Sequence, residues 1–171
     1  MFISMSMAFI GSTCLAAAAI WAGVMDLTTM RIRNEIVIFL FAAYAALAPL
    51  AGFNVGTIAL SFLVALAVLF VSFVFFSFGW IGGGDAKLMA IIALWLGADQ
   101  TLVYLITTSV LGGMLTFGIL MFRQMPLPVF LIRIPWVERL HSFEKGVPYG
   151  VAIAAGALLI LPQTPWVTGV F

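Results

Sequence analysis

Charged residues are scarce in this chain of 171 residues, and hydrophobic residues make up 65% of it. Charged side chains account for only 8%, whereas an average globular domain carries about 25%. This composition leaves too few polar groups to cover a surface that faces water, so it excludes an ordinary soluble domain. The mean hydropathy of +1.27 indicates instead an all-α integral membrane protein.

Cysteine and histidine are each present once, as Cys14 and His141. A single cysteine has no partner for a disulfide, and the two residues are too few for a cysteine–histidine zinc site. No serine–histidine pairing for nucleophilic catalysis is recognisable around His141. The formal net charge of +1 also excludes a nucleic-acid binder that works by neutralising phosphates. The sequence therefore predicts neither a metal nor another cofactor.

Uncharged stretches predict a bundle of about six transmembrane helices, and the fourth is the informative one. The longer stretches cover residues 3–25, 36–53, 55–78, 101–122 and 147 onward. The first of them also permits a cleavable signal peptide, although the basic segment that such a peptide needs is missing. Between them, residues 88–98 span only about half of the hydrocarbon core. A fourth helix must therefore begin near Gly82, which carries Asp85 and Lys87 into or against the membrane.

The basic residues predict the orientation, because cytoplasmic loops collect lysine and arginine. With six spans and both termini non-cytoplasmic, all seven basic residues fall on the inner side, and Asp99 is the only charge on the outer side. The inner residues are Arg31, Arg33, Lys87, Arg123, Arg133, Arg139 and Lys145. The same topology places Asp26, at the inner end of the first span, at the depth of Asp85.

Acidic groups beside membrane spans are costly, so a functional role is the default hypothesis for Asp26 and Asp85. Two carboxyl groups that share a site do not readily both ionise. The ionised one can take a proton from water as it attacks a carbonyl carbon, while the protonated one hydrogen-bonds the carbonyl oxygen. The ends of their own helices favour an ionised Asp85 at a helix start and a protonated Asp26 at a helix end.

Other interpretations of the same residues are open. Asp85 follows a run of glycines and can serve simply as a helix N-cap. Asp26 can pair with Arg31 or Arg33 in the loop that follows it. Lys87, two residues beyond Asp85, faces another side of the helix and suits an interfacial anchor or a substrate contact.

The segment Gly82-Gly83-Gly84-Asp85-Ala86-Lys87-Leu88 resembles the Gly-x-Gly-Asp-x-Lys-Leu signature of the type IV prepilin peptidases, which are intramembrane aspartic proteases. Asp26, followed by Arg31, Arg33 and Asn34, resembles that family's first catalytic aspartate and its basic loop, with Arg33 standing where the family has proline. Residues 147–156 are similar to the start of the family's last helix.

The resemblance implies that residues 1–171 form a single membrane-embedded peptidase domain without the methyltransferase region and zinc motif of larger members. The chain most resembles the short peptidases of tight-adherence (Flp) pilus systems. By that resemblance it is a multi-pass hydrolase of the bacterial inner membrane that acts in pilus biogenesis and protein secretion. The resemblance implies that its catalytic residues are Asp26 and Asp85. By the same resemblance, Gly82, Gly84 and Lys87 position the motif or the substrate, and Arg31, Arg33 and Asn34 are possible loop contacts. The implied substrate is a prepilin, which consists of a short basic leader followed by a hydrophobic helix and is cleaved between the two at the cytoplasmic face.

Two other functions compete with a peptidase. A small proton- or cation-coupled transporter also places acids in the membrane. Two acids at one boundary, without an apparent internal repeat, argue against a transport pathway. The third hypothesis is a non-catalytic assembly protein of a pilus or secretion machine, which would tolerate replacement of either aspartate.

Overall fold

The computed structural model describes residues 2–128, 131, 133–144 and 146–169, and the regular elements among them are all helical. Their bounds are α1 (Phe2–Thr29), α2 (Asn34–Ala51), α3 (Val55–Ser77), α4 (Gly83–Leu96), α5 (Ala98–Gln124), α7 (Pro135–His141), α8 (Tyr149–Ile160), the 3₁₀ turn η1 (Leu161–Gln163) and α9 (Pro165–Thr168). The expected all-α fold is thus confirmed. The predicted stretches match these helices closely, except that α1 continues for three residues beyond Asp26.

Four helices are long and apolar enough to cross a membrane, namely α1, α2, α3 and α5. The other two predicted spans are shorter, since α4 has 14 residues and α8 has 12. A helix needs about 20 residues to cross the hydrocarbon core. The length of the helices therefore supports a membrane protein, while six crossings and the side of each terminus stay predictions.

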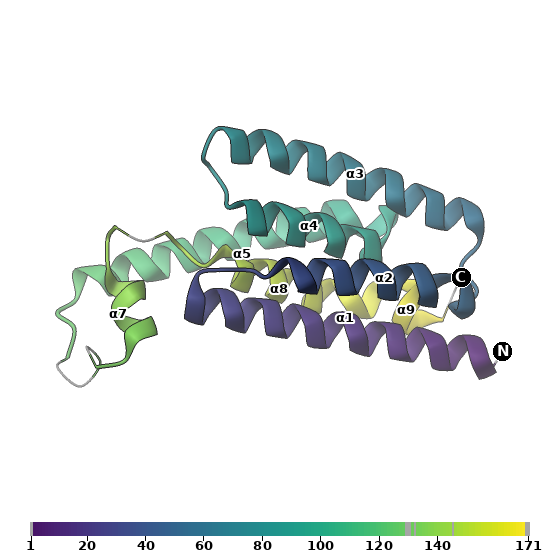
Figure 1. Ribbon diagram of the computed structural model, residues 1–171, viewed down its shortest axis with the longest axis horizontal. Helices are drawn as coiled ribbons and strands as arrows, with labels where there is room; N and C mark the ends of the chain where they lie inside the picture. The colour runs from purple at the N-terminus through teal and green to yellow at the C-terminus, as the bar shows by residue number, and fades with distance from the viewer. Residues whose placement is uncertain (1, 129–130, 132, 145, 170–171) are drawn as a thin grey trace.

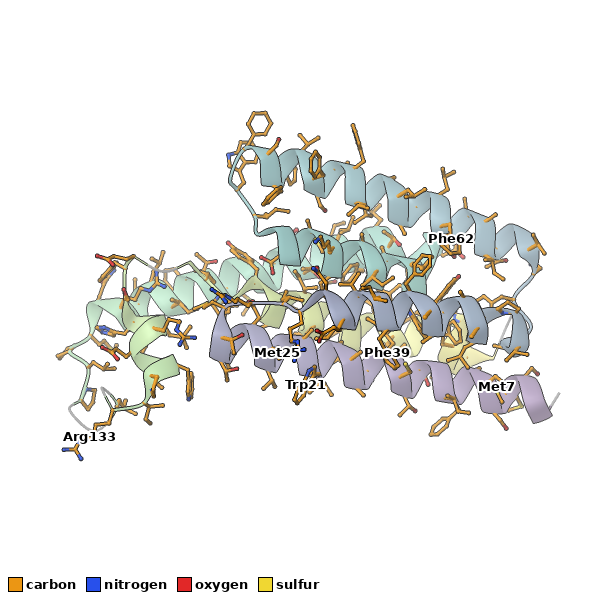
Figure 2. All side chains as sticks on the ribbon, viewed as in Figure 1. Met7, Trp21, Met25, Phe39, Phe62 and Arg133 are labelled. Atoms are coloured by element: carbon orange, nitrogen blue, oxygen red, sulfur yellow. The ribbon has the colours of Figure 1, made fainter. Side chains whose placement is uncertain are left out.

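The long helices run roughly side by side, and the chain reverses direction at each connection (Figure 1). Both termini lie at one end of the bundle, and α7 lies at the other. The short helices are the inner ones, because α4 packs against α2, α3, α5 and α8, while α8 packs against α1, α4 and α5. Side chains on the outside are apolar, as Trp21 and Phe39 show with 60% and 56% of their surface exposed (Figure 2).

Local sequence signals explain where the helices end. Asn54 caps α3 by accepting a hydrogen bond from the Thr57 backbone N–H at 2.8 Å. Gly97 separates α4 from α5 with a φ of 78°, in the left-handed region that glycine adopts without strain. This turn joins two helices without a loop, so it fixes α4 directly against the start of α5.

An aromatic cluster anchors α4 at the end of the bundle that carries the termini. The Trp95 indole N–H donates to the Leu40 carbonyl oxygen at 3.0 Å, and the Trp166 indole N–H donates to the Trp95 carbonyl oxygen at 2.8 Å. Tyr44 packs edge-on against Trp95, with ring centroids 5.5 Å apart. These contacts tie α2, α4 and α9 together, so the position of α4 is fixed at one end by packed rings.

At the opposite end, arginines hold the long connection between α5 and α8. The buried Arg123 donates from Nε to the Leu140 carbonyl oxygen at 2.8 Å and from Nη2 to the Gly146 carbonyl oxygen at 2.9 Å. Arg139 donates from Nη1 to the Thr28 carbonyl oxygen at 2.7 Å, which satisfies an otherwise free carbonyl at the end of α1. Helix α7 is therefore fastened to the end of the bundle where α1 finishes and α4 and α8 begin.

Candidate active site

Asp26 lies near the end of α1, with 6% of its surface exposed. Its Oδ2 atom accepts a hydrogen bond from the Gly150 backbone N–H at 2.7 Å. Gly150 is the second residue of α8, where backbone N–H groups have no partner within their own helix. The carboxyl group at the end of α1 therefore binds the N-terminus of α8.

The absence of a side chain at Gly150 permits this contact. A Cβ atom there would lie 2.8 Å from both Cβ and Oδ2 of Asp26, closer than real Cβ atoms approach other atoms. Sequence analysis gave Gly150 no role, because the hydrogen bond joins residues 124 positions apart. The only signal was the family-like segment 147–156 that contains it.

Asp85 is the third residue of α4, and the N-cap of that helix is Gly82. The interpretation of Asp85 as the N-cap residue is therefore wrong by three positions. The Gly82 backbone hydrogen-bonds the Asp85 carboxyl group, as the third residue of a capping box does. Asp85 Oδ1 is buried and has no hydrogen-bond partner among the described residues. One carboxyl oxygen thus accepts the hydrogen bond at the start of α4, and the other has no bond to a described residue.

The two carboxyl groups are near enough to interact electrostatically. The end of α1 and the starts of α4 and α8 lie toward the same end of the bundle (Figure 1). Each carboxyl group is placed at a helix N-terminus, Asp26 at that of α8 and Asp85 at that of α4. The argument that helix ends distinguish an ionised Asp85 from a protonated Asp26 therefore fails, because it considered only each residue's own helix.

Gly84 allows α4 to pack closely against the loop between α1 and α2. A Cβ atom at Gly84 would lie 3.1 Å from Cβ of Ile32, which is tighter than nearly all real contacts. Gly82 is restricted in the same way, since a Cβ there would lie 2.8 Å from Asp85 Oδ2. Both motif glycines are therefore positions of close approach around Asp85.

Lys87 and Asn34, both named as candidates from the sequence, are in contact. Lys87 Nζ donates a hydrogen bond to Asn34 Oδ1 at 3.0 Å, and this bond links α4 to the start of α2. Arg33 instead forms an exposed ion pair with Glu35. Arg31 is exposed in the same loop. The structure thus places the basic loop beside the start of α4, and neither arginine is shown to contact an aspartate.

A cavity of about 490 Å³ lies beside Asp85, with walls from α3, α4, α5 and α8. Among the residues that the structure describes, no three His, Cys, Asp or Glu side chains gather to form a metal site. The described site consists of two acids, the backbone of two helix starts and an apolar cavity. Two adjacent carboxyl groups are able to exchange protons with a water molecule between them.

Comparison with known protein families identifies a relationship. A sequence model of the type IV leader peptidase family matches residues 13–117, a range that holds both aspartates and the glycine motif but ends before α8. No curated protein and no solved structure matches the chain.

Proposed function

The chain belongs to the type IV leader peptidase family, and we propose that it is an aspartic endopeptidase whose catalytic residues are Asp26 and Asp85. Family membership makes it a membrane-embedded protease of prepilin leader peptides. The proposal adds the catalytic pair, cleavage at the cytoplasmic boundary of the bacterial inner membrane, and a Flp-type prepilin as the substrate. The observation that carries it is the placement of both acids around the start of α8, where Asp26 accepts a hydrogen bond from the Gly150 N–H and Asp85 lines a cavity together with Tyr149.

The reaction uses one water molecule and both carboxyl groups. The ionised carboxylate takes a proton from water, and the water oxygen attacks the scissile carbonyl carbon. The protonated carboxyl group donates a hydrogen bond to the carbonyl oxygen and stabilises the charge that forms there. A proton then passes to the amide nitrogen, the C–N bond breaks, and the leader carboxylate and the new amine leave.

The contacts of the two acids suit this reaction. Asp26 is held by the Gly150 N–H on one oxygen, which fixes its orientation. Asp85 keeps Oδ1 without a protein partner, and a buried carboxyl oxygen of this kind is costly unless water or substrate bonds it. The pair thus combines a fixed group with an available one.

Co-expression with candidate type IV and Flp prepilins tests the proposal. The wild-type chain is expected to shorten one of these prepilins, and this is seen as a size shift on a gel. Asp26→Asn and Asp85→Asn should each abolish the shift, because asparagine can neither accept the proton from water nor donate as an acid.

Asp99→Asn is the matched control, since Asp99 is an exposed acid at the start of α5, away from the pair. It should leave cleavage unchanged. Cleavage that survives at the wild-type level in Asp26→Asn or Asp85→Asn would reject the aspartic mechanism. Absence of cleavage by the wild-type chain for every prepilin tested would instead fit a non-catalytic assembly protein or a transporter.

A further inference from the structure

The cavity beside Asp85 is bordered on its exposed side by α3 and α5. Its inner wall comes from α4 and α8 and includes Met89, Tyr149 and Ile153. Its rim consists of exposed residues on α3 and α5, namely Ala67, Val71, Phe75 and Ser109. The opening therefore lies between α3 and α5, on the face that lipid surrounds if these helices cross the membrane.

The cavity has its one acidic side chain at one end, and apolar side chains form most of the rest of its lining, with hydroxyls from Ser72, Thr108 and Ser109 among them. Asp85 and Tyr149 lie in the first turns of α4 and α8, and Met89 and Ile153 lie one turn deeper along the same helices. Along α3 the lining runs from Phe75 to Ala67, which is about 12 Å at 1.5 Å per residue. An apolar channel thus leads away from the carboxyl group into the depth of the bundle.

This arrangement selects the kind of molecule that fits. Asp85 Oδ1 needs a hydrogen-bonding partner at the polar end, whereas the exposed rim and the deeper wall are dominated by apolar side chains. A lipid acyl chain would cover the apolar wall but leave the oxygen unpaired, and the phosphate of a lipid headgroup would place a negative charge beside two acidic groups. A polar peptide would hydrogen-bond the oxygen but would leave the apolar wall without apolar contacts. A chain that changes from polar to apolar at the level of Asp85 satisfies both.

We propose that the cavity between α3 and α5 is the docking site for the first part of the substrate's hydrophobic segment, which enters sideways from the lipid. This inference rests on the proposed peptidase function. The channel of about 12 Å accommodates about eight residues of a helix or about four residues of extended chain. The scissile bond then lies at its polar end, beside Asp85.

Two other surface grooves do not meet these requirements. The groove between α1 and α2 is larger, about 740 Å³, but neither aspartate lines it. A smaller groove between α2, α3 and α4, about 170 Å³, is lined by Lys87 and apolar side chains, again without either acid. The cavity on the α3–α5 side is thus the one of the three that joins an apolar channel to a candidate catalytic group.

A matched pair of variants on α3 tests the docking site. Ala67 lines the rim and Ala59 does not, although both are exposed alanines of the same helix. Ala67→Trp fills the channel and should lower kcat/KM for a Flp-type prepilin by about tenfold or more, chiefly through KM, while Ala59→Trp stays within about twofold of wild type. Equal kcat/KM values in Ala67→Trp, Ala59→Trp and wild type would overturn the proposal.

Photocrosslinking provides a second readout that does not depend on turnover. A photoreactive phenylalanine derivative replaces Ala67 or Ala59 in the Asp85→Asn chain, and the same full-length prepilin is added in lipid nanodiscs. A crosslink from position 67 and none from position 59 supports the docking site even if Ala67→Trp does not fold. Crosslinks of equal yield from both positions, or none from position 67, would overturn it. Failure of the wild-type chain to cleave any prepilin is the separate result that rejects the proposed function.

Discussion

Gly150→Ala should disrupt the site although it adds only one methyl group. The new Cβ would lie 2.8 Å from Cβ and Oδ2 of Asp26, whereas carbon atoms in contact normally lie about 3.5 to 4.0 Å apart. Asp26 or the start of α8 must therefore move by about 0.7 Å or more. That movement also strains the 2.7 Å hydrogen bond from the Gly150 N–H to Asp26. Because a displacement of about 1 Å at a catalytic group can cost about 100-fold in rate, we expect a loss of about 10- to 100-fold in kcat.

The assay is the initial rate of prepilin cleavage by purified protein in nanodiscs, with thermal unfolding of each variant measured in parallel. Gly113→Ala is the control, because a Cβ at Gly113 meets no atom within 4 Å. It should keep the wild-type rate and lose no stability, since alanine favours a helix over glycine by about 1 kcal/mol. A Gly150→Ala protein that is folded and cleaves as fast as Gly113→Ala would refute the role given to the α8 N-terminus.

Two further predictions concern the supports of the site. Lys87→Met removes the 3.0 Å hydrogen bond to Asn34 while keeping an unbranched side chain. Because an exposed hydrogen bond of this kind contributes about 1 kcal/mol, kcat/KM should fall by about fivefold or less. A complete loss of cleavage would show instead that Lys87 acts on the substrate or the acids directly. Trp166→Ala removes a side chain that is 1% exposed and packs against Trp95. The free energy of unfolding should fall by about 3 to 5 kcal/mol, which lowers the midpoint of thermal unfolding. An unchanged midpoint would contradict the role of the aromatic cluster in anchoring α4.

Most of the helices could be predicted from the sequence, because apolar stretches and the turn-forming residues between them determine the helix bounds locally. Uncharged stretches and glycine or asparagine turns marked the ends of α2, α3 and α5 to within a few residues. The sequence says less about where α4 and α8 lie within the bundle. Both helices pack among the others, and burial by neighbouring helices is a tertiary property that no local pattern shows.

The candidate site was accessible to sequence reasoning only in part. The cost of acids near the membrane was sufficient to single out Asp26 and Asp85. The partner of Asp26 could not be predicted, because the Gly150 N–H is a backbone group that any residue except proline has. The position of that group depends on how α8 packs against α1. For the same reason the helix ends were misjudged as a guide to which acid is protonated. The lateral cavity likewise depends on four helices that are distant in sequence.

The central claim is that Asp26 and Asp85 act as one catalytic unit. Its most direct test is the residual rate of prepilin cleavage by purified Asp26→Asn, Asp85→Asn and the double variant, with Asp99→Asn as the reference. Residues that act as a unit are strongly non-additive, so the double variant should be no slower than either single variant, and all three should be at least about 1,000-fold slower than the reference. Single variants that retain substantial rates, with losses that multiply in the double variant, would contradict the claim.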